Sequence, residues 1–327
     1  MRIDLHTHFY PAEYWDMLAK WGEGYEATKD AFGRTIIKKN GARFLTPTPP
    51  MGDPEARLRE MDAAGVDVQA ISLSAPNVYF APDERGLEVA RFTNDKLAGV
   101  RDKYPKRFMC LASVPLQNVE MAIDELRRAI NQLGMNGLLI GSNVNGKPLN
   151  SPDFEPFWAE VNKLKLTVCM HPMVPLGSEQ MQEYGLAPMV GFIFDCNLAI
   201  ARMIYDGIFE RYPDMKFVLP HLGGAVSILM ERWDHGFREM PDCRVRISRP
   251  PSEYVKNLYF DTVNFHKPAL MCCYASVGAK QMVLGSDYPH IIGDIYRAVT
   301  SIQDMDISDE EKEMIFGGNA LKILRPN

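Results

Sequence analysis

The chain opens with MRIDLHTHFYP, residues 1–11, and this stretch decides the fold prediction. The residues before the first histidine alternate between polar and apolar, which predicts a short β-strand. His6 and His8 stand two positions apart at the end of that strand. Because residues two apart share one face of a strand, both imidazoles can bind a single metal ion. The stretch therefore predicts a strand that delivers two metal ligands to one place.

Seven more apolar runs follow, and most are continuously apolar or β-branched, as in strands buried on both faces. Amphipathic stretches with helical spacing lie between them. This alternation predicts a parallel sheet, and eight units in 327 residues predict an α/β fold, a (β/α)8 TIM barrel that forms one domain over residues 1–327. The predicted strands are residues 2–6, 66–74, 107–116, 135–142, 166–172, 216–224, 258–264 and 281–289. The clearest predicted helices are residues 54–65, 119–134, 153–164 and 308–324.

Three segments fall outside this alternation. Residues 10–53 contain several glycines and the sequence TPTPPMGDP, so they predict an insertion after strand 1. We expect the insertion to lie on the rim that carries the active site. Residues 173–190 and 240–252 predict further long loops.

The composition excludes several classes of partner. Net charge is −6 and the basic residues are scattered, so the chain lacks the basic stripe that nucleic-acid binding requires. No apolar run approaches the roughly 18–20 residues of a membrane span, and Asp4 and His6 interrupt any signal-peptide pattern. The six cysteines show no metal-ligand spacing, which favours free thiols in a reducing compartment. We therefore expect a cytoplasmic protein that binds neither nucleic acid nor a membrane.

Histidines and one aspartate recur at the ends of predicted strands. His171 ends the fifth strand, His221 lies late in the sixth and Asp287 ends the eighth. In a parallel barrel all these ends open on one face, where catalytic residues lie. Each residue also has a plainer interpretation, as an incidental strand histidine or, for Asp287, as a helix cap. Their joint placement favours an open catalytic site of three histidines and one carboxylate, with zinc, manganese or a similar metal.

The stretches that carry these residues resemble the amidohydrolase superfamily, in particular its decarboxylase branch and the aminocarboxymuconate semialdehyde decarboxylases. The resemblance runs from end to end of the chain. The matching stretches are IDLHTHFYP (3–11), DPEARLREMDAAGVDVQAIS (53–72), HP (171–172), FVLPHLGGAV (217–226), LGSDYPH (284–290) and GGNALKIL (317–324).

The resemblance implies a residue for each role. It implies that His6, His8, His171 and Asp287 are the metal ligands and that His221 is the catalytic histidine beside them. It implies zinc, or in some members manganese, as the cofactor. It also implies a small-molecule carboxylic acid as substrate and a homodimer or dimer of dimers.

The chain departs from that family where the substrate carboxylates bind. The family carries an arginine just after a phenylalanine before the first helix, but here Leu45 follows Phe44 and Arg43 precedes it. Of two arginines on the helix after strand 6, Arg232 matches the first, whereas Met240 stands at the second. We therefore predict a substrate with fewer carboxylates, a monocarboxylic phenolic acid, with Arg43 and Arg232 as its anchors.

The chemistry expected of this site is nonoxidative decarboxylation of a phenolic aromatic or unsaturated carboxylic acid. A metal ion would stabilise the charge that develops as CO2 leaves, and Asp287 and His221 are the available proton carriers. Residues near the strand ends that could line a flat pocket are Phe9, Tyr10, Phe44, Tyr79, Tyr288 and His290.

Two alternatives remain open from the sequence. The same metal site could hydrolyse a lactone, an amide or a ring-cleavage product of aromatic catabolism, or hydrate an unsaturated acid. The chain could also be a metal-binding regulatory protein that has lost catalysis, although every expected metal-site residue is retained.

Overall fold

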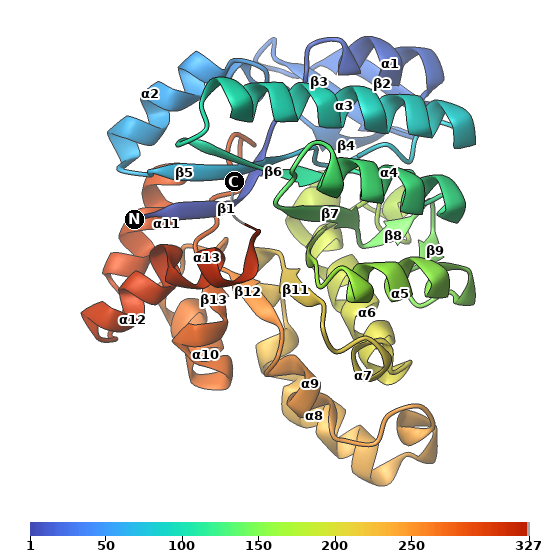
Figure 1. Ribbon diagram of the computed structural model, residues 1–327, viewed down its shortest axis with the longest axis vertical. Coiled ribbons are helices and arrows are strands. Elements are labelled where there is room, and N and C mark those ends of the chain that lie inside the picture. The colour runs from blue at the N-terminus through green and yellow to red at the C-terminus, as the bar shows by residue number, and fades with distance from the viewer. Residues whose placement is uncertain (326–327) are drawn as a thin grey trace.

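The fold is a barrel of parallel strands, and the computed structural model describes residues 1–325 of the chain. Residues 326–327, which belong to the predicted domain, lie outside the described residues. Within residues 1–325, eight strands form one sheet in the order β1-β5-β6-β7-β10-β11-β12-β13 (Figure 1). Every predicted strand is confirmed, though each except the first is shorter than its apolar run. The strands are β1 (Ile3–His8), β5 (Val68–Ser72), β6 (Phe108–Ala112), β7 (Gly137–Gly141), β10 (Thr167–His171), β11 (Lys216–Leu219), β12 (Tyr259–Asp261) and β13 (Met282–Val283).

The two end strands of the sheet meet and close the barrel. The Leu5 N–H donates to the Leu284 carbonyl over 2.9 Å, just beyond β13. The Asp287 N–H donates to the His6 carbonyl, also over 2.9 Å, and the His8 N–H donates to the Tyr288 carbonyl over 2.8 Å. These hydrogen bonds hold the extended segment after β13 alongside β1. They bring the residue at 287 next to the two histidines of β1.

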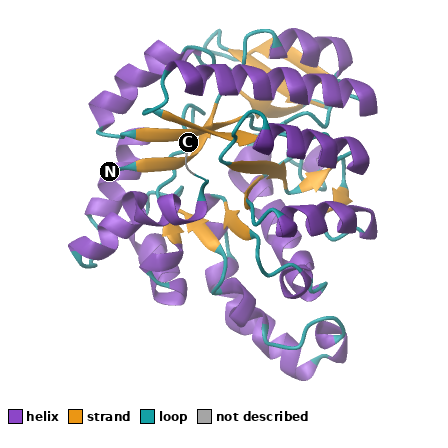
Figure 2. Ribbon diagram, viewed as in Figure 1, coloured by secondary structure: helices purple, strands orange, loops and turns teal. Residues whose placement is uncertain are grey.

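Helices surround the strands on the outside, as Figure 2 shows. The four clearest predicted helices are confirmed, and the last of them is continuous through a π-helical turn between α12 and α13. The helices that accompany the barrel are α2 (Pro54–Ala64), α3 (Asp83–Lys103), α4 (Val119–Asn131), α5 (Glu155–Lys163), α6 (Phe192–Tyr205), α7 (Ile208–Arg211), α8 (Val226–Glu239), α9 (Pro251–Val255), α10 (Lys267–Val277), α11 (Ile295–Gln303), α12 (Asp309–Glu313) and α13 (Asn319–Ile323).

A small apolar core fills the barrel below the strand ends. Ile3 and Leu5 of β1 belong to it together with residues of the other strands. The C-terminal segment caps this core, since Ile323 and Leu324 pack into the same cluster. A larger core lies between the outer face of the barrel and the helices. Because the lower barrel is packed, a ligand can reach the interior only from the opposite end.

A bulge in β1 turns its histidines into the barrel. Asp4 pairs with Gln69 and Thr7 pairs with Ile71, so β1 has one residue more than β5 between these two pairs. An extra residue shifts the alternation of faces by one. Leu5 can therefore point into the apolar core while His6, the next residue, points into the barrel above it. Without the bulge the strand could not place both an apolar floor and the two histidines inside.

Residues 10–53, expected as a rim insertion, form a helix and a small antiparallel sheet between β1 and α2. The helix is α1 (Tyr14–Trp21), and the sheet has the order β2-β3-β4. Its last strand brings residues 43–46 to the cavity above the barrel strands. The strands outside the barrel are β2 (Tyr25–Lys29), β3 (Thr35–Lys39), β4 (Ala42–Leu45), β8 (Asn143–Val144) and β9 (Lys147–Pro148).

The expectation that no apolar stretch reaches membrane-spanning length needs a correction. Within the described residues, the 19-residue helical stretch Ala187–Tyr205 is long and apolar enough by length and composition. The sequence did not predict a helix over this stretch because Pro188 and Gly191 favour a loop. In the structure both residues lie in a π-helical turn that continues into α6. More than half of the stretch is buried against the protein itself. Buried core helices meet the same criterion, so the stretch is weak evidence for a membrane.

The cysteines form no disulfides within the described residues, as expected. Cys272 and Cys273 are adjacent on α10, but the first is exposed and the second is buried. The Cys110 thiol is buried as well, and burial raises its pKa to about 12. Buried thiols of this kind behave as small apolar side chains.

Candidate metal centre and active site

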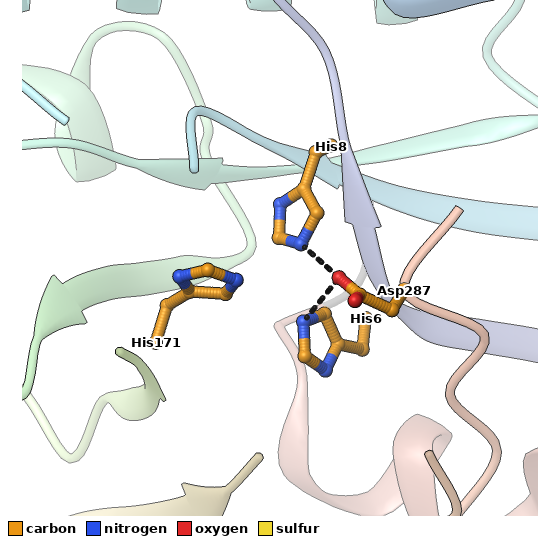
Figure 3. A group of neighbouring side chains, drawn as sticks. All are labelled: His6, His8, His171 and Asp287. Carbon is orange, nitrogen blue, oxygen red and sulfur yellow. Dashed lines mark hydrogen bonds and ion pairs between the residues drawn. The ribbon is translucent and has the colours of Figure 1, made fainter. Parts of the chain in front are cut away.

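Three histidines and one aspartate converge at the carboxyl ends of the barrel strands (Figure 3). His6 and His8 come from β1, His171 ends β10 and Asp287 follows β13. One nitrogen or oxygen atom of each residue lies within 4.8 Å of those of the other three, and all four residues are buried. The Asp287 Oδ1 atom is 3.4 Å from His6 Nε2 and 3.1 Å from His8 Nε2. The structure therefore brings together the four residues that the sequence predicts as metal ligands.

Asp261, the last residue of β12, fixes the ring of His6. The His6 Nδ1–H group donates to Asp261 Oδ2 over 2.5 Å. The other carboxylate oxygen accepts the backbone N–H groups of Leu222 and Val263, each at 3.0 Å. Because a carboxylate only accepts, His6 Nδ1 carries a proton, so the neutral form of the ring has its lone pair on Nε2. Among the described residues that Nε2 atom is buried without a hydrogen-bond partner.

His8 and His171 are held in the same tautomer. The Ser72 hydroxyl donates to the Thr7 carbonyl over 2.8 Å, so it accepts from His8 Nδ1, which lies 3.2 Å away. The His171 Nδ1–H group donates to the Pro172 carbonyl over 2.9 Å. In both rings the lone pair is therefore on Nε2. Three Nε2 lone pairs and a carboxylate, each ring fixed by an outer partner, are the donor set that a zinc or manganese ion takes.

The charge balance of the cluster also fits a cation. Burial lowers the pKa of His8 and of His171 well below the usual value, so both rings are neutral. For Asp287 burial would raise the pKa, but the surrounding histidines outweigh it and hold the carboxylate ionised. For His6 burial would lower the pKa, but Asp261 and Asp287 outweigh it and raise it to about 10. The cluster thus favours a positive charge next to its two carboxylates, which a metal ion can supply in place of a proton.

His221 lies on the other side of the Asp287 carboxylate. Its Nε2 atom is 3.8 Å from Asp287 Oδ2, whereas His6 and His8 face Oδ1. Both His221 and Asp287 have positive φ angles, 52° and 57°. Such angles are uncommon outside glycine and concentrate at functional sites. His221 is therefore positioned to exchange a proton with the free oxygen of Asp287 or with a ligand above it.

A cavity opens above this cluster, and its walls are mainly apolar. Besides the histidines and Asp287, only a few lining residues have polar side chains, among them Arg43 and Ser74. A cavity with apolar walls and few polar groups is typical of a site for a small organic ligand. The lining residues are Arg43, Phe44, Leu45, Thr46, Ser74, Ala75, His171, Pro188, Phe192, His221, Asp287, His290, Ile291 and Ile292.

Comparison with known families gives the same assignment as the site. Residues 3–325 match the sequence model described as Amidohydrolase. The chain belongs to the amidohydrolase family. The resemblance to this family noted in the sequence is confirmed.

Named relatives of this amidohydrolase are decarboxylases. The chain is 35% identical to the 2-amino-3-carboxymuconate-6-semialdehyde decarboxylase of Dictyostelium discoideum, over 99% of this chain and 91% of the relative. The crystal structure of 5-carboxyvanillate decarboxylase from Sphingomonas paucimobilis superposes with a TM-score of 0.86, at 28% identity, covering 100% of this chain and 99% of the other. A dihydroxybenzoic acid decarboxylase from Polaromonas sp. JS666, solved with manganese and the inhibitor 2-nitroresorcinol, gives 0.83 at 27% identity, covering 98% and 96%.

The predicted substrate-binding residues of this amidohydrolase divide into two groups. Arg43, Phe44 and His290 line the cavity. Tyr79 and Tyr288 do not belong to its lining. The Tyr79 hydroxyl instead accepts the Gly141 N–H, and the Tyr288 ring lies against another side chain.

Arg232 also lies apart from the cavity of the single chain. It is exposed on α8, the helix that extends away from the barrel in Figure 1. An anchoring role for Arg232 would therefore require a second chain.

Sequence reasoning missed several residues that support the amidohydrolase site. Asp261 carried a signal, because it is an acidic residue inside a predicted barrel strand, residues 258–264. Ser72 and Ser74 carried none, since small polar residues are common near strand ends. Arg57 of α2 was missed as well, although it is fully buried and donates to the His8 carbonyl. Its guanidinium also lies 4.9 Å from the centre of the Tyr288 ring, so it links the two segments that carry His8 and Asp287.

Replacing Asp261 by asparagine is expected to weaken metal binding without unfolding the barrel. The asparagine side chain would keep the size of the aspartate and one carbonyl oxygen for the backbone N–H groups. Its NH2 group would then face His6 Nδ1 as a donor, so it could not accept the Nδ1 proton that the carboxylate accepts. Loss of such an outer partner typically lowers metal affinity about 10- to 100-fold. Competition of the variant with a chelator for manganese or zinc measures the change. Unchanged affinity would show that Asp261 does not act through His6.

Proposed function

We propose that this protein is a metal-dependent nonoxidative decarboxylase that acts on a phenolic aromatic or unsaturated carboxylic acid. The observation that carries the proposal is the joint position of three imidazole Nε2 atoms and Asp287 at the floor of an apolar cavity, with His221 beside them. Membership in the amidohydrolase family and the named decarboxylases among its relatives support the reaction type.

The proposed ligands are His6, His8, His171 and Asp287, holding one metal ion. The donor set suits zinc, and the Polaromonas relative, which was solved with manganese, supports manganese as the other candidate. When bound, the ion would act as a Lewis acid toward a substrate oxygen. A single ion is favoured because β7 ends in Ile140 and Gly141, where no side chain can bridge to a second metal.

The cavity residues provide binding for one flat acid. Phe44, Phe192 and Ile291 offer apolar surface for an aromatic ring or a planar diene. Within the described residues Arg43 is the one lysine or arginine among the lining residues. Its charge is only partly compensated, since Asp30 Oδ2 lies 3.6 Å away and is itself bound by Arg34 at 2.8 Å. One arginine supports the proposal of a substrate with a single carboxylate.

The reaction needs a proton delivered to carbon. The bond between the substrate carbon and its carboxylate breaks, its electron pair stays on that carbon, and CO2 leaves. The carbon gains one proton, so acid RCOO⁻ and H⁺ become RH and CO2. Asp287 Oδ2 and His221 Nε2 are the two groups at the cavity floor that can hold and pass that proton. The apolar walls limit water around the carbon while it is protonated.

We also propose that two copies associate through α6 and α8. The apolar side chains of Phe194 on α6 and Ile228 on α8 are 68% and 74% exposed. Pro188 and Phe192 of the adjoining segment line the cavity, so a partner on this face would lie close to the site. Exposed apolar surface of this kind marks association sites. Light scattering that gives the mass of one chain would contradict the proposal.

The reaction type can be tested by product analysis. Metal-loaded protein is incubated with 2-hydroxybenzoate, 2,6-dihydroxybenzoate and a lactone, each in water enriched in heavy oxygen. Release of CO2 with no heavy oxygen in the organic product is expected. Heavy oxygen in the organic product without CO2 would instead indicate hydrolysis or hydration. Neither change with any compound would contradict an enzyme of this class.

Replacing Arg43 by methionine is expected to raise KM more than it lowers kcat. A charge-assisted hydrogen bond contributes enough that its loss should lower kcat/KM roughly 10- to 100-fold. Arg34→Met is the matched control, because Arg34 also binds Asp30 but does not line this cavity. It should leave KM unchanged. Equal kinetics for the two variants would remove Arg43 from the substrate site.

A further inference from the structure

A buried polar network lies beside the metal cluster, where β1 and β5 meet α2 and the segment after β13. Its members are Asp4, Gln69, Arg57 and Ser286, and each of them is fully buried. None of the four lines the cavity or belongs to the proposed metal ligands. Buried charges are costly unless hydrogen bonds and an opposite charge satisfy them. Apolar side chains of similar volume would avoid that cost, so the polar ones need a reason.

The hydrogen bonds of the network fix the direction of each donor. Arg57 Nη1 donates to Gln69 Oε1 over 2.8 Å, so the opposite end of that amide is its NH2 group. Gln69 Nε2 donates in turn to Asp4 Oδ2 over 3.2 Å. Gln69 therefore bridges two opposite charges, the guanidinium of Arg57 and the carboxylate of Asp4.

At the other end of the network, Asp4 holds Ser286, the residue before Asp287. The Ser286 N–H donates to Asp4 Oδ1 over 3.1 Å, and the Ser286 hydroxyl donates to Asp4 Oδ2 over 2.5 Å. The same hydroxyl accepts the Tyr288 N–H over 3.1 Å. Asp4 therefore fixes the residues on both sides of Asp287, one directly and the other through the Ser286 hydroxyl.

Asp287 needs such support because of its backbone conformation. Its φ angle is 57°, in the left-handed region, where a residue other than glycine persists only if the surrounding structure fixes it. The conformation matters for the site, because Oδ1 faces His6 and His8 whereas Oδ2 faces His221. A return of φ to negative values would turn both oxygens away from these partners.

We propose that Asp4 is a positioning residue that sets the orientation of the Asp287 carboxylate through Ser286. Arg57, which fixes Asp4 through the network, also donates to the His8 carbonyl. The network thereby joins the strand that carries two of the proposed ligands to the turn that carries Asp287. The proposal rests on the ligands named under the proposed function, but it concerns their geometry and is independent of the substrate.

The experiment removes the Asp4 carboxylate and measures the metal site directly. In Asp4→Asn an NH2 group replaces one acceptor oxygen, so Ser286 and Gln69 can no longer both donate. Competition with a chelator should give a manganese affinity about 10- to 100-fold below that of the wild type, the scale for losing a group that orients a ligand. Ser286→Ala removes only the hydroxyl and should have a smaller effect of the same sign. The visible absorption of cobalt-loaded samples, which reports ligand geometry, should change in both variants.

Glu125→Gln is the matched control. Glu125 is a fully buried carboxylate that accepts from Asn94 Nδ2 over 2.7 Å and from Arg128 Nη2 over 2.9 Å. It belongs neither to the cavity lining nor to the metal cluster. Its replacement should lower the unfolding temperature but leave the manganese affinity and the cobalt spectrum unchanged. This contrast separates positioning from a general loss of stability.

The possible outcomes distinguish this proposal from the proposed function. Wild-type manganese affinity and an unchanged cobalt spectrum in Asp4→Asn would overturn it, and so would an equal loss of affinity in Glu125→Gln. If Asp4→Asn does not fold, Ser286→Ala decides by the same two measurements. A wild type that binds no manganese would overturn the ligand set together with this proposal. A wild type that binds manganese but decarboxylates no acid would contradict only the proposed function, since the two measurements on the variants need no substrate.

Discussion

Purified His6→Ala is expected to contain almost no metal and to have no measurable decarboxylase activity. His6 Nε2 is buried without a hydrogen-bond partner among residues 1–325, and the ring is fixed by Asp261. Removing it takes away one of the four ligands and leaves the buried Asp261 carboxylate without its imidazole partner. Metal content should fall from about one ion per chain to below about 0.1, as elemental analysis after dialysis would measure. Thermal unfolding of the same sample reports whether the barrel persists.

His235→Ala provides the matched control. His235 is an exposed histidine on α8, outside the cavity, so its loss should change neither metal content nor activity. Added manganese or zinc should raise the unfolding temperature of the wild type and of His235→Ala, but not that of His6→Ala. A His6→Ala protein that binds one metal ion as tightly as the wild type would show that the ion lies elsewhere. Full activity of metal-free wild type would contradict the metal-dependent reaction.

The barrel could be predicted because its signals are local. Each buried parallel strand is a short apolar run, and each helix between them has its own periodicity. Histidine or aspartate recurs at the ends of several of these strands, and the ends of parallel strands share one open face. The metal cluster could therefore be predicted as well. The bulge in β1 could not be predicted. It depends on pairing with β5, and without it the alternation would place Leu5 and His6 on opposite faces.

The parts of the site that escaped prediction depend on contacts between distant elements. Asp261 contacts His6 across the barrel, because β12 is not a neighbour of β1 in the sheet. Ser74 becomes significant only through its distances to two imidazoles. Tyr288 follows a cavity residue directly, and its ring lies against Arg57 instead of joining the lining. Sequence position alone cannot distinguish these arrangements.

His221→Asn is expected to keep the metal and lose roughly 10²- to 10⁴-fold in kcat, the usual scale for general acid–base catalysis. His221 faces Asp287 Oδ2 at 3.8 Å, whereas the cluster with His6 and His8 forms at Oδ1. Removing the imidazole should therefore remove the proton carrier but no metal ligand. The kcat of the metal-loaded variant, divided by that of the wild type with the same metal content, measures the effect.

Asparagine is the appropriate replacement because of the backbone at this position. His221 and Leu222 both have positive φ, 52° and 59°, and asparagine is among the residues that tolerate this conformation best. Alanine would add strain next to Leu222, whose N–H donates to Asp261. His221→Asn should consequently unfold near the wild-type temperature, so that a loss of rate reports chemistry. Loss of the metal would reassign His221 to the ligands, and a full rate with full metal content would leave Asp287 as the sole proton carrier at the cavity floor.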